Sequence, residues 1–230
     1  MLFRSVLWLV YIALEPFARR RWPEALTSWS RLLAGDWRDP LVGRHILIGC
    51  CCAAGNVLLQ RLTPLIISAL GGPGVVPQIL NSSVLFGAKG IAAWATGLIS
   101  IVPLVSFAYF FMLFLFRLLT RRDWVAAIVF ALIFAVLNGL GTGSLVFALI
   151  NAAGIGFLLF ILLRVGLLAV SAAVAFSNIL YTFPLTLHFS AWYAGLGLTG
   201  LVLAVAFAGT AFYISLGGRP VFGAALEEQV

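Results

Sequence analysis

The sequence predicts an all-α fold, a polytopic bundle of about seven transmembrane helices with one amphipathic helix on the cytoplasmic membrane surface. Of the 230 residues, 63% are hydrophobic and 9% are charged, which is too little polar surface for a soluble protein of this size. The apolar residues gather in segments of roughly 20, the length that crosses a hydrocarbon core of about 30 Å. Segments such as residues 145–163 are apolar on every face, whereas strands of a transmembrane barrel alternate polar and apolar residues.

The apolar segments divide the chain into a single membrane domain, residues 1–230, without room for a soluble catalytic domain. The first segment is short for a span, and it is followed by Glu15, Pro16 and a run of arginines. A secretory signal peptide would instead end at a small-residue cleavage site. The predicted spans are residues 2–14, 45–62, 93–119, 124–140, 145–163, 165–187 and 192–216.

The distribution of cations predicts the orientation, because loops rich in lysine and arginine stay in the cytoplasm. With the N-terminus outside and the C-terminus in the cytoplasm, only Arg4, Arg61 and Lys89 lie outside. We therefore expect a multi-pass protein of the bacterial inner membrane. The formal charge of +7 does not indicate nucleic-acid binding, since no basic patch is interleaved with exposed aromatic residues. The inner cations are Arg19, Arg20, Arg21, Arg31, Arg38, Arg44, Arg117, Arg121, Arg122, Arg164 and Arg219.

Residues 22–34 predict the interfacial amphipathic helix. Trp22, Leu26, Trp29 and Leu33 recur at helical spacing and form one apolar face. Pro23 suits the first helical turn and Gly35 the position after the last, as in many helices. We expect the helix to lie among the cytoplasmic lipid headgroups, where indoles and arginines are favourable. The predicted interfacial anchor consists of Arg19, Arg20, Arg21, Trp22, Trp29 and Arg31.

The segment of residues 63–90 contains three prolines and several glycines, so it cannot be a regular helix throughout. We expect an ordered loop on the outer face. A re-entrant piece formed by residues 65–70 is the alternative, which requires protein or water to cover its open backbone.

Polar residues within the predicted spans are the candidate functional residues. No ionisable group falls at mid-membrane depth, which argues against an ion-coupled transporter. Asn138, Asn151 and Asn178 fall in the outer halves of their spans and form a candidate intramembrane polar cluster. They either hydrogen-bond across helices as packing contacts or line a small polar pocket open to the outside.

The sequence predicts no cofactor, no metal site and no catalytic residue. His45 and His188 fall at opposite ends of their spans, so they cannot share a metal or a haem. Cys50, Cys51 and Cys52 point about 100° apart on a helix, whereas metal ligands must converge. No kinase, protease or hydrolase motif is present in the chain.

Two stretches resemble a known family. Residues 14–44 read LEPFARRRWPEALTSWSRLLAGDWRDPLVGR, and residues 217–223 read GGRPVFG. Together they resemble the C-terminal membrane region of some bacterial serine/threonine protein kinases, in which a cytoplasmic kinase domain precedes several spans. The chain itself has no glycine-rich loop with a strand lysine, no HRD and no DFG, so no catalytic residue is carried over. It is either a stand-alone relative of that region or an internal portion of a longer protein.

Two functions from different classes remain open. The resemblance implies a membrane anchor or sensor module, or a subunit, associated with kinase signalling. Such a module would bind the lipid bilayer, and a protein partner or a second copy through its spans and its arginine-rich inner face. The alternative is a small permease that carries a neutral solute past the three asparagines.

Overall fold

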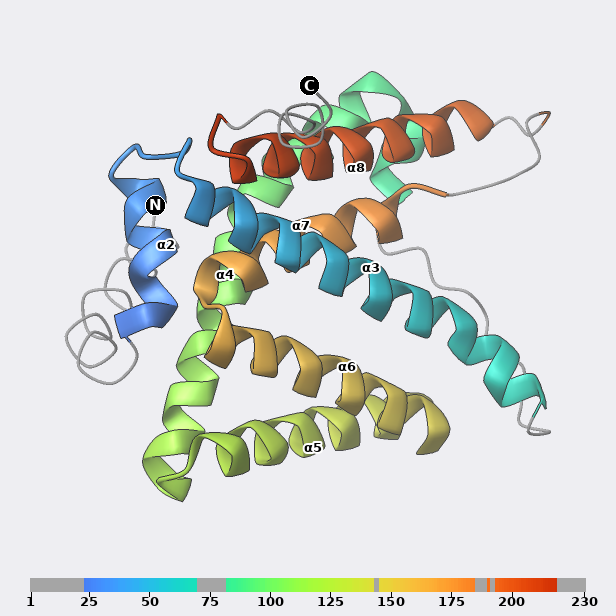
Figure 1. Cartoon of the computed structure of the whole chain (residues 1–230). Coiled ribbons are helices and arrows are strands. Elements are labelled where there is room, and N and C mark those ends of the chain that lie inside the picture. The colour runs from blue at the N-terminus through green and yellow to red at the C-terminus, as the bar shows by residue number, and fades with distance from the viewer. Residues whose placement is uncertain (1–22, 70–81, 143–144, 185–189, 191–192, 219–230) are drawn as a thin grey trace, which may run out of the picture.

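The structure is a computed structural model that describes residues 23–69, 82–142, 145–184, 190 and 193–218. Every element in these ranges is helical, so the all-α prediction is confirmed. Figure 1 shows their arrangement. The elements are α2 (Pro23–Leu33), α3 (Pro40–Ala69), the 3-10 helix η1 (Ser82–Phe86), α4 (Ala88–Thr120), α5 (Asp123–Thr142), α6 (Leu145–Arg164), α7 (Leu167–Thr182) and α8 (Ala194–Ser215).

Four of the described helices, α3, α4, α6 and α8, are long and apolar enough to cross a membrane. The chain is therefore a multi-pass helical membrane protein, but the prediction of about seven spans is wrong. Among the described residues, Asp123–Leu137 and Leu167–Thr182 form shorter apolar helices. The predicted span at residues 2–14 lies outside the part of the chain that the structure describes.

Helix α7 shows why counting apolar residues overestimated the spans. The sequence predicted a span over residues 165–187, but α7 begins after Gly166, whose φ of 115° favours glycine. It ends at Phe183, which is extended because the following Pro184 disfavours helical geometry at the residue before it. Its 16 residues measure about 24 Å, less than a hydrocarbon core of about 30 Å.

Helix α3 is longer than predicted at both ends. The Leu41 N–H donates a hydrogen bond of 2.8 Å to Oδ1 of Asp39, so Asp39 caps the helix and Pro40 occupies the first turn. The helix continues through Pro64 to its end, so the predicted outer loop begins later than residue 63. Residues 65–69, which were the alternative re-entrant piece together with residue 70, are the last turns of α3, and residues 70–81 lie outside the described ranges.

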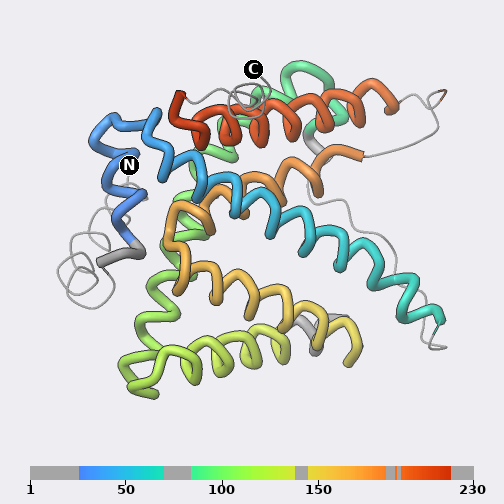
Figure 2. Tube along the Cα trace, viewed as in Figure 1, coloured from blue at the N-terminus to red at the C-terminus, as the bar shows by residue number. Residues whose placement is uncertain are grey.

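Helix α3 also lies at the centre of the bundle, where it packs against α2, α6, α7 and α8. Figure 2 shows it running between α6 and α8. Two glycines permit the closest approaches. A Cβ atom on Gly43 would lie under 3.0 Å from backbone atoms of Ala211 and Ser215 in α8, and one on Gly49 would meet the Ala169 carbonyl oxygen in α7. These contacts bring backbones together as small residues do in membrane helices.

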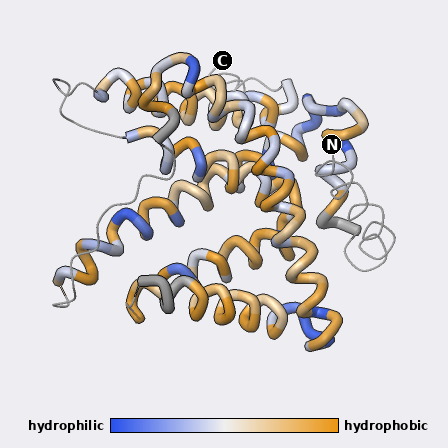
Figure 3. The backbone as a smooth tube through the Cα atoms, turned by 180° about the vertical axis from the view of Figure 1, so that it is seen from behind, coloured by the Kyte–Doolittle hydropathy of each residue, from blue (hydrophilic) through white to orange (hydrophobic). Residues whose placement is uncertain are grey.

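Two apolar cores hold the helices together. One gathers α2, the second half of α4, α5, α6 and the start of α7 around Leu113 and Leu159. The other gathers α3, the start of α4, the end of α7 and α8 around Trp94 and Phe183. Apolar side chains also cover much of the exposed helical surface, and Figure 3 shows hydrophobic helices joined by hydrophilic turns. A surface of this kind suits a hydrocarbon solvent.

Candidate functional site

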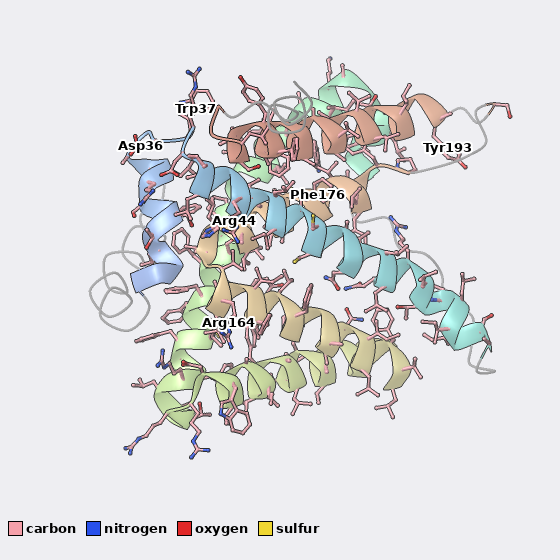
Figure 4. The ribbon with its side chains drawn as sticks, viewed as in Figure 1. Asp36, Trp37, Arg44, Arg164, Phe176 and Tyr193 are labelled. Atoms are coloured by element: carbon pink, nitrogen blue, oxygen red, sulfur yellow. The ribbon has the colours of Figure 1, made fainter. Side chains whose placement is uncertain are left out.

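The clearest organised polar region lies where α3 begins and α8 ends. Figure 4 shows Asp36, Trp37, Arg44 and Arg164 on this side of the bundle. The α6–α7 turn and the α4–α5 turn also lie on this side (Figure 1). We call this side the arginine-rich end. Its described cations are Arg31, Arg38, Arg44, Arg117, Arg121, Arg122 and Arg164.

Helix α2 is docked on the bundle at this end. Leu26 and Ser28 are buried, and Ser28 Oγ forms a hydrogen bond of 2.9 Å with His45 Nδ1 at the start of α3. The Trp29 ring packs edge-to-face on Phe107 of α4, with ring centroids 5.5 Å apart. The predicted amphipathic helix is therefore present, and the half-buried Trp29 packs on protein on one side, while its contact with lipid headgroups stays a prediction. Of the other anchor residues, Arg31 is described, whereas Arg19, Arg20, Arg21 and Trp22 lie outside the described ranges.

Residues 35–39 connect α2 to α3 and are referred to below as the Trp37 turn. Gly35 adopts a φ of 95°, which allows the Asp36 N–H to bond back to the Arg31 carbonyl oxygen at 3.0 Å. Arg31 also forms an ion pair with Asp39. The Leu41 N–H and the Arg31 guanidinium both hold the pKa of Asp39 below its ordinary value. The turn is thus tied to both helices that flank it.

The Trp37 turn presents an aromatic ring and a cation at the surface. Trp37 is 52% exposed, and the guanidinium carbon of Arg38 lies 4.5 Å from its ring centroid. The turn residues line a hollow of about 450 Å³. Tryptophan and arginine are the residues most enriched where protein partners bind tightly. An exposed indole also suits the surface of a bilayer.

The three predicted asparagines make separate contacts. Asn178 Oδ1 accepts hydrogen bonds from Trp94 Nε1 of α4 at 2.9 Å and from Thr182 Oγ1 at 3.3 Å. Asn151 Nδ2 donates to the Phe147 carbonyl oxygen of its own helix at 2.9 Å. The Asn138 side chain lies outside the described set, so the cluster as a whole stays a prediction. The contact that the structure does show, between α4 and α7, differs from the predicted one.

The structure also shows polar contacts of α3 with α6 and with α7 that the sequence analysis did not predict. Asn56 Oδ1 is buried against Gly154 of α6 and has no hydrogen-bond partner. Arg61 donates a long hydrogen bond of 3.4 Å to the Leu180 carbonyl oxygen, and its guanidinium lies 5.4 Å from the Tyr181 ring centroid. The Tyr181 hydroxyl is also buried without a partner. The polar side chains of residues 56, 60 and 61 within an apolar segment were the available signal.

The comparisons with known proteins find no matching protein family, no matching curated protein and no matching solved structure. The resemblance of residues 14–44 to kinase membrane regions therefore depends on those residues alone. Their described part consists of α2, the Trp37 turn and the first turns of α3.

Among the described residues, no three His, Cys, Asp or Glu side chains come close enough together to hold a metal ion. The three adjacent cysteines are free thiols, and they differ in burial as expected for consecutive helical positions: Cys50 is buried, Cys52 is half-buried and Cys51 is exposed. His188 lies outside the described residues, and His45 is engaged by Ser28.

Proposed function

We propose that the chain is a non-catalytic membrane anchor that holds a protein partner at its arginine-rich end. The Trp37 turn is the observation that carries this proposal. Its backbone hydrogen bonds and the ion pair between Arg31 and Asp39 order the turn before any partner binds. Binding then costs little loop-ordering entropy, which is the advantage of a pre-organised contact surface.

The proposed partner is a serine/threonine kinase domain, either fused to this chain or separate from it. The most specific part of the resemblance, residues 14–44, includes α2 and the Trp37 turn. Docking of α2 on the bundle through Leu26 and Ser28 gives a partner bound there a fixed position relative to the spans. A sensor could use such a connection, because a shift of α3 would move the turn.

The orientation is part of the same proposal. We place the arginine-rich end in the cytoplasm, because cations are retained there during insertion. In a variant with alanine at all three native cysteines, Trp37→Cys should react with an impermeant maleimide only after the membrane is permeabilised. Phe86→Cys, which replaces an 80% exposed side chain in the segment predicted to face outward, should react in intact cells. The reverse labelling pattern would overturn the orientation.

A photo-crosslinking experiment in native membranes tests the partner. Benzoylphenylalanine at position 37 of the full chain should form an adduct with a kinase that mass spectrometry identifies. The same residue at position 86 serves as the control, since Phe86 is exposed but distant in sequence from the turn. Arg38→Glu should abolish the adduct at position 37. Lipid adducts alone from position 37 would contradict the proposal.

A permease for a neutral solute is the second candidate, and one observation favours it. The Asn56 Oδ1 and Tyr181 hydroxyl atoms are buried without partners, and buried polar groups without partners are costly unless they serve a ligand or a water. In proteoliposomes, Asn56→Leu and Tyr181→Phe should each lower uptake, as should replacing Asn138, Asn151 and Asn178 with Leu. Tyr213→Phe, at a 77% exposed position, is the matched control. Unchanged uptake of sugars, polyols and amides in all variants would exclude this function.

A further inference from the structure

An apolar groove runs along the α5–α6 hairpin, with a volume of about 430 Å³. Small residues from both helices form its floor, and large side chains form its walls. The floor includes Ala127, Ala131, Ala152 and Gly156, and the walls include Trp124 and Phe160. Outside the groove, the hairpin exposes large apolar side chains such as Val136 and Leu149, so the groove opens toward the hydrocarbon.

The length of the groove matches one leaflet of a bilayer. Its lining runs from Trp124 to Leu132 on α5 and from Leu163 back to Ala152 on α6. At 1.5 Å per helical residue these distances are about 12 Å and 16 Å, or roughly half of a 30 Å hydrocarbon core. The groove begins at the arginine-rich end, where α5 starts and α6 finishes (Figure 1). Its shape therefore suits an acyl chain that enters from that membrane surface.

The mouth of the groove carries an excess of positive charge. Arg164 follows the lining residue Leu163, and its guanidinium carbon lies 5.8 Å from the ring centroid of Phe160, which is itself a wall. Arg121 and Arg122 lie exposed on the turn that leads into α5. The neighbouring carboxylate of Asp123 already forms an ion pair with Arg117 at 2.6 Å.

We propose that this groove binds one anionic phospholipid. One acyl chain fills the apolar floor, and the phosphate lies at the mouth beside Arg164, within reach of Arg121 or Arg122. Charge complementarity decides between this occupant and a second copy of the chain. A two-fold symmetric contact would place the arginine-rich mouths of both copies side by side, and the like charges would repel.

Lipid retention by the full chain, purified in mild detergent and stripped of native lipid, tests the charge requirement. Native mass spectrometry would compare dioleoyl phosphatidylglycerol with dioleoyl phosphatidylcholine, which share acyl chains and differ in net charge. We expect preferential retention of phosphatidylglycerol. Arg164→Gln should lower that retention roughly fivefold, the effect of one cation at a membrane surface. Lys89→Gln removes the same charge elsewhere and should leave retention unchanged.

A second variant tests the groove itself. Ala153 lines the groove from an exposed position, so Ala153→Phe should fill it and reduce retention of both lipids. Leu149→Phe enlarges an exposed side chain one helical turn away, outside the lining, and is the matched control. A single symmetric peak in size-exclusion chromatography confirms that each variant is folded.

Three results would overturn the proposal. Equal retention of the two lipids would remove the anionic preference. Retention that Ala153→Phe does not reduce would place the lipid elsewhere on the protein. A lipid-free dimer that Ala153→Phe dissociates would assign the groove to a second copy of the chain. All three results are measured on the purified chain without a protein partner or a transported solute, so they are independent of the tests of the proposed function.

Discussion

Ser28 Oγ and His45 Nδ1 lie 2.9 Å apart, and this hydrogen bond joins α2 to the first turns of α3. Ser28 is fully buried at this contact. Helix α2 is therefore packed as part of the bundle, although it is too short to cross a membrane. The Trp37 turn, which lies between these two helices, depends on the same contact for its position.

Ser28→Ala should loosen α2. The substitution removes the hydrogen bond to the half-buried His45, and a typical intramolecular hydrogen bond contributes about 0.5–1.5 kcal/mol. Hydrogen–deuterium exchange of the amides in residues 23–33 should quicken in this variant. Ser30→Ala is the control, because the Ser30 hydroxyl bonds only its own helix at the Thr27 carbonyl oxygen. Equal exchange in the two variants would show that the Ser28 contact does not hold α2.

Gly49→Ala and Gly55→Ala should shift stability in opposite directions. The added Cβ at Gly49 meets the Ala169 backbone carbonyl and must push α3 away from α7, at a cost of about 1–3 kcal/mol as in other overpacked sites. At Gly55 nothing lies within 4 Å, so the better helix propensity of alanine should stabilise the protein slightly. Thermal unfolding in detergent, followed by size-exclusion chromatography, measures both. An unchanged melting temperature for Gly49→Ala would contradict the close packing of α3 against α7.

Trp94→Phe should weaken the contact between α4 and α7. The variant loses the hydrogen bond from Trp94 Nε1 to Asn178 Oδ1 but keeps an aromatic ring near Phe183, whose centroid lies 5.1 Å away. Hydrogen bonds between membrane helices average about 0.6 kcal/mol, so we expect a small decrease in the melting temperature. Trp124→Phe, at a 60% exposed indole, should change it less. In a protein that already carries Asn178→Leu, Trp94→Phe should lower the melting temperature less, because the hydrogen bond is already absent.

Acid should loosen the Trp37 turn. The Leu41 N–H and Arg31 lower the pKa of Asp39, so its carboxylate stabilises the folded turn above the ordinary carboxyl pKa of about 3.9. That stabilisation is lost as the pH falls through the lowered pKa. Trp37 fluorescence should change in this acidic range in a background where the other tryptophans are replaced by Phe. Asp39→Asn should remove the transition, and Asp36→Asn should retain it.

The sequence predicted much of the fold because its strongest signals are local. Apolar length located the helices, and Pro23 in the first turn and Gly35 after the last turn located α2. The predicted starts of α5 and α6 agree with the structure to within one residue. The number of spans was overestimated because apolar composition continues past a helix end. Helix α7 ends at Thr182, two residues before Pro184, in a stretch where hydropathy alone indicated a longer helix.

The sites were predicted less well, because a helix that is apolar on every side does not reveal which face meets a neighbour. Asn178 was correctly identified as a polar residue within a helix, but its bond to Trp94 joins positions 84 residues apart. Asn56 was overlooked although Gly154 lies against it, since no local pattern connects the two. The contact of Trp29 with Phe107 was not predicted either, because helical spacing showed an apolar face without showing which residue packs on it.

The close contact of Gly49 with Ala169 also constrains how the protein is made. The two residues are separated by 120 positions in the chain. At a translation rate of about 5–20 residues per second, α3 leaves the ribosome roughly 6–24 s before its main packing partner. During that interval the side chains of Asn56 and Arg61 lack the α6 and α7 surfaces that later cover or contact them. The insertion machinery or a membrane chaperone would have to shield α3 until the last third of the chain has been synthesised.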